Sequence, residues 1–176
     1  MENKITLYIY GAIIIFGGLF LLIYQNSDYN TIRITLGSTL IIGAVFSFLT
    51  ALSSKKKQVQ FDYHEMHALA MLVYGVSVLV FCNKLETLIN FTSFLFFFYA
   101  FSEIIFCLRI FDLGRKVIYK IVFTRLLLGL IVGIGTVMIM NYYDTSNTLV
   151  LRAYGTLFII IGVNILLYVP IMKKIN

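Results

Sequence analysis

The stretch from Phe91 to Leu108 constrains this chain more than any other part. Its 18 residues are nearly all apolar, which is long enough for a helix to cross the hydrocarbon core of a bilayer. One carboxylate, Glu103, interrupts the stretch. Because an isolated charge is costly inside a membrane, Glu103 needs to be paired or protonated. The stretch therefore predicts a transmembrane helix whose single carboxylate needs a physical explanation.

Five similar stretches accompany it. The predicted spans are residues 6–24, 34–52, 66–83, 91–111, 121–140 and 152–171. Backbone groups find no water to bond in hydrocarbon, so these runs are expected to be helices. The 176-residue chain is 60% hydrophobic and 12% charged, which is too apolar for the surface of a soluble domain. The sequence predicts an all-α polytopic membrane protein, with six transmembrane helices in a single domain covering residues 1–176.

Lysine and arginine gather at one set of span ends. Eleven of the 14 are Lys4, Lys55, Lys56, Lys57, Arg109, Arg115, Lys116, Lys120, Arg125, Lys173 and Lys174. The opposite ends carry Arg33, Lys84 and Arg152. The positive-inside rule then predicts a multi-pass protein of the inner membrane with both termini in the cytoplasm. These bases flank apolar spans rather than a polar module, so the net charge of +6 does not indicate nucleic-acid binding.

A spacing of 58 residues recurs along the chain. The glycines that share it are Gly17, Gly75 and Gly133, and the acids that share it are Asp28, Glu86 and Asp144. Later matches are 119 residues apart and pair Arg33 with Arg152 and Gly43 with Gly162. The chain therefore divides into three tandem helical hairpins, at about residues 5–53, 64–111 and 119–172. Three two-span units give parallel repeats, which favours a pseudo-threefold bundle over the inverted repeats of many transporters.

The segments that carry the repeat resemble a known family. The first hairpin contains YGAIIIFGGLFLLIY and LGSTLIIGAVFSFLTAL; the later ones contain YGVSVLVFC with FYAFSEIIFCL, and LLLGLIVGIGTVMIM with YGTLFIIIGVNILLY. This pattern, with glycines in the odd spans and short outer turns, resembles the HdeD-like acid-resistance membrane proteins over nearly the whole chain. Membership would imply an inner-membrane protein of stress or acid tolerance, with no enzymatic residues to carry over.

Small residues are the candidates for close helix packing. The predicted packing glycines are Gly17, Gly43, Gly75, Gly129, Gly133 and Gly162. Gly129 and Gly133, with Gly135 beyond them, form a small-residue face of the GxxxG type. Such a face serves either packing within the bundle or association of two copies, and the second alternative predicts a homo-oligomer. The lipid bilayer is the other expected partner.

Three polar residues are expected at a similar membrane depth. Glu103 lies 12 positions from Phe91 and Asn164 lies 12 positions from Arg152, or about 18 Å along each helix. Arg125 lies slightly closer to the cytoplasmic ends. We expect Glu103, Arg125 and Asn164 to meet in the bundle interior. They form either a structural tie between helices or a proton-responsive or solute-binding site; the third alternative is a protonated Glu103 that faces lipid.

The two histidines form the other polar cluster. His64 and His67 share a helical face and, with Asp62, are weak candidates for a zinc site. Their spacing is one residue short of the HExxH motif of metalloproteases. Anchoring at the headgroup level and pH sensing are the alternatives. Cys82 and Cys107 are predicted near opposite membrane faces, so we expect no disulfide between them.

These patterns favour a non-enzymatic membrane protein without a cofactor. The sequence contains no phosphate-binding glycine loop and no nucleophile set at one membrane level. The alternative is a small transporter or channel in which Glu103 lines the path. A continuous polar cavity would favour transport, whereas a dry and fully packed bundle would favour a structural or associative role.

Overall fold

The computed structural model describes residues 4–53, 58–112, 118–142 and 147–172, and these residues form helices joined by short connections. The helices are α1 (Lys4–Ile23), α2 (Tyr29–Ser53), α3 (Gln58–Phe81), α4 (Leu85–Asp112), α5 (Tyr119–Tyr142), α6 (Asn147–Leu166) and the short α7 (Tyr168–Met172). Six of them are long and apolar enough to cross a membrane. The prediction of an all-α membrane protein with six spans is confirmed.

The helices extend beyond the apolar spans, mainly at their amino-terminal ends. α2 begins at Tyr29 rather than near Ile34, because Asp28 caps it. The Asp28 carboxylate accepts hydrogen bonds from the Thr31 backbone N–H (3.0 Å) and hydroxyl (2.6 Å). These bonds lower the pKa of the Asp28 carboxyl from its ordinary value. Hydropathy alone misses such polar first turns, because capping rather than apolar burial stabilises them.

The sixth span is interrupted near its end. α6 ends at Leu166, and Pro170 lies within the short helix α7. Proline has no N–H to donate and disfavours a continuous helix before it, so the chain turns at Leu167. The predicted sixth span is confirmed, because the apolar segment that could cross the membrane runs from Thr148 to Ile171, and only the helix within it is divided at Leu167. The break matters for the interior, because α7 carries the fully buried Tyr168.

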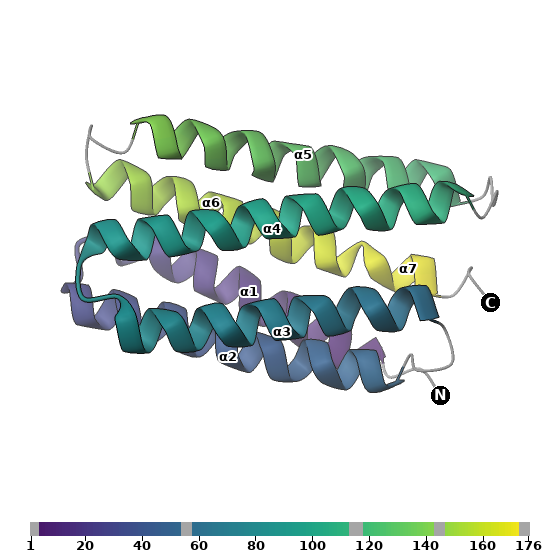
Figure 1. Cartoon of the computed structure of the whole chain (residues 1–176), viewed down its shortest axis with the longest axis horizontal. Coiled ribbons are helices and arrows are strands. Elements are labelled where there is room, and N and C mark those ends of the chain that lie inside the picture. Colours follow the sequence, from purple (N-terminus) through teal and green to yellow (C-terminus); the bar gives the residue numbers. More distant parts are fainter. Residues whose placement is uncertain (1–3, 54–57, 113–117, 143–146, 173–176) are drawn as a thin grey trace.

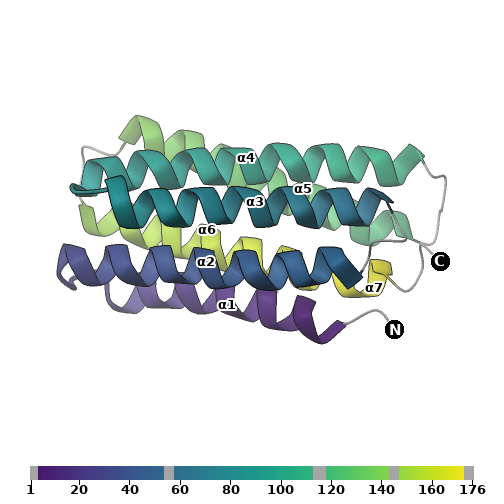
Figure 2. The ribbon, with the colours of Figure 1, turned by 60° about the horizontal axis from the view of Figure 1, so that its bottom comes forward.

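The six long helices form a closed ring. Each helix contacts the next one along the chain, and α6 returns against α1 (Figures 1 and 2). α1 begins and α7 ends at the same end of the bundle, where α2 and α4 also end and α3 and α5 begin (Figure 1). We call this the basic end, because most lysines and arginines of the sequence fall in or beside these segments.

The most extensive helix contacts lie between hairpins rather than within them. They join α1 to α6, α2 to α3, and α4 to α5. A Cβ on Gly18 would lie 2.6 Å from the Gly155 carbonyl oxygen, and one on Gly75 would lie 3.1 Å from the Gly37 oxygen. At the third contact, a Cβ on Gly133 would lie 3.2 Å from the Ala100 Cβ. Small residues therefore bring the backbones together at all three contacts.

All six predicted packing glycines lie against another helix. Their nearest neighbours on that helix are Thr39 for Gly17, Ile14 for Gly43, Ile41 for Gly75, Glu103 for Gly129, Ala100 for Gly133 and Ile15 for Gly162. Gly17 differs from its repeat mates, because it faces the following helix, α2. Gly18, one residue away from the predicted match, instead faces a helix of another hairpin, as Gly75 and Gly133 do. Gly11, Gly37 and Gly155 also lie at these contacts, but they lack the 58-residue spacing and were not predicted.

Arg33 and Arg152, which are matched in the repeat, make similar contacts in the structure. Arg33 of α2 donates to the Cys82 carbonyl oxygen (3.3 Å) just beyond α3, and Arg152 of α6 donates to the Gln25 side chain just beyond α1. Each joins an even-numbered helix to the carboxyl end of the odd-numbered helix that it packs against. Asp144, the third acid of the repeat, lies outside the described residues.

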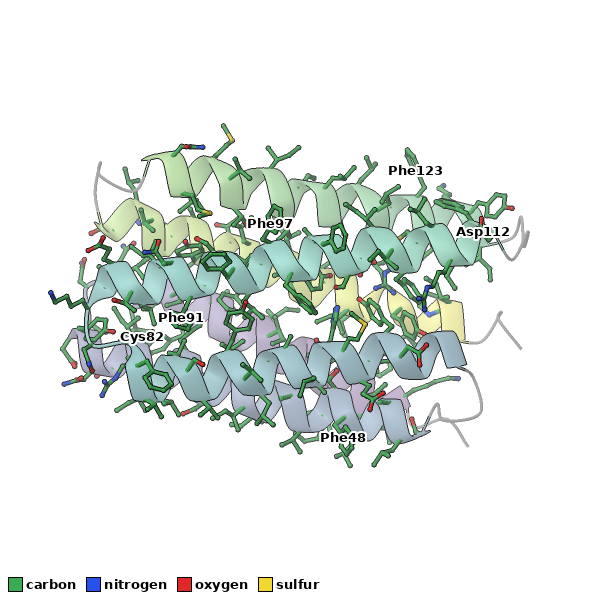
Figure 3. All side chains as sticks on the ribbon, in the orientation of Figure 1. Phe48, Cys82, Phe91, Phe97, Asp112 and Phe123 are labelled. Carbon is green, nitrogen blue, oxygen red and sulfur yellow. The ribbon has the colours of Figure 1, made fainter. Side chains whose placement is uncertain are left out.

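The outer surface of the ring is apolar. Phe48, Phe97 and Phe123 project outward (Figure 3), and each exposes about half of its surface. Such a surface suits contact with acyl chains, because each large apolar group would otherwise face water.

Cys82 and Cys107 are both free thiols.

Candidate functional site

The interior of the bundle holds an ion pair between α4 and α5. The Arg125 guanidinium donates from Nε to Glu103 Oε1 (2.8 Å) and from Nη2 to Oε2 (2.9 Å). Both side chains are completely buried. Two parallel hydrogen bonds between a guanidinium and a carboxylate combine charge attraction with a fixed geometry. The structure thus brings Glu103 and Arg125 together, and Glu103 does not face lipid.

The local sequence makes room for this pair. Gly129 lies one turn beyond Arg125 on α5, and a Cβ there would lie 2.9 Å from the Glu103 Cγ. A larger residue at 129 would therefore push the Glu103 side chain away from α5. Gly129 thus makes space for the carboxylate as well as allowing a close approach of the helices.

Tyr63 connects a third helix to the pair. Its hydroxyl donates to Glu103 Oε2 (2.5 Å) and accepts from Arg125 Nη2 (2.9 Å). The Cys107 thiol makes a weaker contact of 3.7 Å with the other carboxylate oxygen. The carboxylate therefore receives donors from α3, α4 and α5, and Tyr63 contacts both members of the pair.

Aromatic rings surround the guanidinium. The Cζ atom of Arg125 lies 5.5 Å from the ring centroid of Tyr63 and 4.9 Å from those of Phe106 and Tyr168. Ring faces carry partial negative charge and attract a cation at such distances. Arg125 Nη1 has no hydrogen-bond partner within the described residues. The guanidinium is therefore held by one carboxylate and an aromatic cage.

Asn164 joins the network through different partners from those expected. Its Nδ2 donates to the Tyr99 hydroxyl (2.7 Å) and, at 3.4 Å, to the Arg125 backbone carbonyl. In the described part of the chain it therefore ties α6 to α4 and α5 without bonding the Glu103 carboxylate. The three predicted residues do gather at one level, but only Glu103 and Arg125 form a direct pair.

Both histidines lie inside the bundle. His64 exposes 1% of its surface and His67 exposes 3%, so anchoring at the headgroup level is wrong for both. His67 Nε2 lies 2.7 Å from the Ser102 hydroxyl oxygen, and that hydroxyl donates to the Tyr99 carbonyl (2.8 Å). His67 and Ser102 thus form a hydrogen bond between α3 and α4. The helical face that carries the predicted zinc candidates thus points into the ring.

Asp62 does not join the imidazoles. It lies beside Arg109 instead, with 3.7 Å between Oδ2 and Nη1. His64 packs against the Tyr63 and Tyr168 rings, and neither of its ring nitrogens has a hydrogen-bond partner among the residues described. No group of three or more metal-binding side chains occurs within the described ranges. The geometry therefore lends no support to a zinc site at His64 and His67.

The space at the centre of the ring is small. A cavity of about 30 Å³ lies beside Tyr10, His67, Tyr99, Phe96 and Phe158, and its lining is almost wholly apolar. A polar tie lies between α4 and α6, where the hydroxyls of Ser93 and Tyr154 are 2.5 Å apart. The central cavity is thus small and apolar, and the polar groups of the ion pair bond to side chains of neighbouring helices.

Tyr63, Tyr99, Ser102 and Tyr168 were not predicted as members of this network. Tyr63 and Tyr168 lie near span ends, where tyrosines are ordinarily read as interfacial anchors. Tyr99 and Ser102 lie within the predicted span 91–111, and only the rotation of the helix shows that they point inward. Tyr63 directly precedes the polar His64-Glu65-Met66-His67 run, and this neighbourhood is the one signal that pointed to it.

The chain matches no protein-family model, no curated protein and no solved structure. The resemblance to HdeD-like proteins accordingly stays a prediction.

Proposed function

We propose that this integral membrane protein is non-enzymatic and contributes to stress or acid tolerance, as the resemblance to HdeD-like proteins suggests. In this proposal it acts through its structure or through association of copies in the inner membrane. Its basic end faces the cytoplasm, as the distribution of lysine and arginine favours.

The observation that carries this proposal is the buried polar network around Glu103. Tyr63, Glu103 and Arg125 bond to one another, and Asn164 and Tyr99 complete the ties between α4, α5 and α6. Such a network fixes the relative rotation of the helices, because each member loses its partners if one helix turns. This arrangement favours a structural role over that of a transporter or channel.

A growth experiment tests the proposal. A strain deleted for the protein is compared with the same strain carrying the wild-type chain or the Glu103→Gln variant, across acid pH and other stresses. We expect lower survival of the deletion strain in at least one stress, restored by the wild type and less by the variant. Equal survival of all strains in every condition would contradict the proposal.

One observation favours a small transporter or channel as a second candidate. The polar side chains continue from the ion pair level toward the central cavity, through Ser102, His67 and, at 3.5 Å from His67, the Tyr10 hydroxyl. In this alternative, Glu103 would be the proton-responsive or solute-binding group, and the cavity would widen in a second conformation.

The test is proton flux into liposomes that contain the purified chain and a pH-sensitive dye. If the chain conducts protons, an imposed pH gradient should collapse faster than in empty liposomes, and Glu103→Gln should slow it. If proton flux equals that of empty liposomes at every pH and voltage applied, Glu103 is not part of a proton path.

A further inference from the structure

A crevice opens between α3 and α4 near the basic end. Its volume is about 120 Å³, and its lining includes Asp62, Met66, Ile105, Phe106 and Arg109. For comparison, an apolar cavity of about 150 Å³ holds one benzene molecule, so this space suits a short apolar segment rather than a whole lipid. Tyr63 and Ser102, both buried, also line it.

The two charged residues of the crevice lie near helix ends, where we expect the lipid headgroups. Arg109 is three residues from the end of α4, and Asp62 is four residues from the start of α3, so both are about 4–6 Å from a helix end. Their side chains are 54% and 39% exposed. The crevice is thus apolar on the membrane side and carries one positive and one negative group at its polar edge.

The Asp62–Arg109 contact is loose. Its 3.7 Å separation exceeds the 2.7–2.9 Å that is typical of a charge-assisted hydrogen bond. An exposed pair of this kind contributes little to stability. A ligand that offers each group a closer partner can therefore replace the contact at small cost.

We propose that this crevice binds one phosphatidylethanolamine molecule from the leaflet at the basic end. The lipid phosphate contacts Arg109, and the primary ammonium donates hydrogen bonds to Asp62. The glycerol linkage and the first part of an acyl chain pack against Met66, Ile105 and Phe106.

Charge complementarity selects this lipid among the common ones. Phosphatidylglycerol would place its phosphate beside Asp62 without a compensating cation. Phosphatidylcholine has the right charges, but its quaternary ammonium has no N–H to donate to the carboxylate. This proposal is independent of both functions proposed above. A bound lipid would nevertheless lie next to the buried polar network, because Tyr63 lines the crevice and also forms hydrogen bonds with Glu103 and Arg125.

Native mass spectrometry of the purified full chain tests the proposal. The first bound lipid is titrated with phosphatidylethanolamine, phosphatidylcholine and phosphatidylglycerol of identical acyl chains. We expect phosphatidylethanolamine to bind about fivefold more tightly than phosphatidylcholine, the upper end for one exposed ion pair. Equal affinities for these two lipids, or tighter binding of phosphatidylglycerol, would overturn the proposal.

Three variants and two controls locate the site. Asp62→Asn should abolish the preference for phosphatidylethanolamine over phosphatidylcholine, and Arg109→Gln should weaken both. Ile105→Trp, which fills the crevice, should weaken binding of every lipid, with thermal unfolding showing that the variant is folded. Asp112→Asn and Lys120→Gln are matched controls, because these exposed charges lie at the same end outside the crevice (Figure 3 labels Asp112). A preference that survives Asp62→Asn would exclude this site.

Discussion

At the scale of single residues, the Glu103–Arg125 pair is the buried ion pair around which the polar side chains of the interior are arranged. A buried ion pair does not by itself prove a stabilising interaction, since removing both charges from water costs several kcal/mol. Removing one partner is different, because the other charge then stays buried and uncompensated. This asymmetry makes the pair testable.

The first prediction concerns the coupling of the two charges. Glu103→Gln and Arg125→Gln should each lower the free energy of unfolding by about 3–5 kcal/mol, and the double variant should lose clearly less than the sum. Unfolding in mixed micelles titrated with dodecyl sulfate measures all four proteins. Additive losses would mean that the pair seen in the structure contributes no coupling energy.

The second prediction concerns Tyr63. Tyr63→Phe removes the hydroxyl that contacts both Glu103 and Arg125 and should lower the free energy of unfolding by about 1–3 kcal/mol. The same change at Tyr8, which is 52% exposed on α1, is the control and should have little effect. If the two variants unfold alike, the Tyr63 hydroxyl is not an essential partner of the pair.

At the scale of helices, small residues determine which pairs approach closely. The closest approaches join α1 to α6 and α2 to α3 through backbone contacts between glycines, whereas α4 and α5 meet through Ala100 and Gly133. Because interhelical packing in a membrane depends on close contact rather than on exclusion of water, an added methyl group at such a contact is poorly tolerated.

The third prediction ranks glycine substitutions by what the new Cβ would meet. Gly155→Ala would place its Cβ 2.7 Å from the Gly18 carbonyl oxygen, which is backbone and cannot move without shifting α1. We expect a loss of about 1–3 kcal/mol in the free energy of unfolding. Gly135→Ala meets only the side chain of Leu157, whose nearest atom, Cδ2, lies at 3.0 Å, and should be milder. The reverse order of stabilities would refute the proposed importance of the α1–α6 approach.

At the scale of the whole molecule, the ring has two unlike ends. The basic end contains the starts of α1, α3 and α5 and the ends of α2, α4 and α7 (Figure 2 shows the same grouping from another side). In a membrane this asymmetry predicts one orientation, with the basic end in the cytoplasm.

The fourth prediction tests that orientation. Single cysteines are placed at Asn30, Lys57 and Asn147, in a background with both native cysteines replaced by alanine. An impermeant thiol reagent added to intact cells should label positions 30 and 147 and spare position 57. Labelling of position 57 alone would invert the orientation.

The sequence by itself determined the class and the number of spans. Apolar runs of this length leave the backbone no alternative to helices in a bilayer, so six spans follow from hydropathy alone. It also placed Glu103, Arg125 and Asn164 at one level, because the rise per residue of a helix converts sequence position into depth.

Only the tertiary structure decided how the helices turn about their axes. Hydropathy is nearly uniform around a membrane helix, so the sequence did not show that His64 and His67 point inward, or that Gly18 rather than Gly17 faces the neighbouring α6. The sequence likewise did not show that Tyr63 forms hydrogen bonds with Glu103 and Arg125, since a tyrosine near a span end can equally lie at the membrane–water interface. Rotation is set by contacts between helices distant in sequence, and these exist only once the ring has closed.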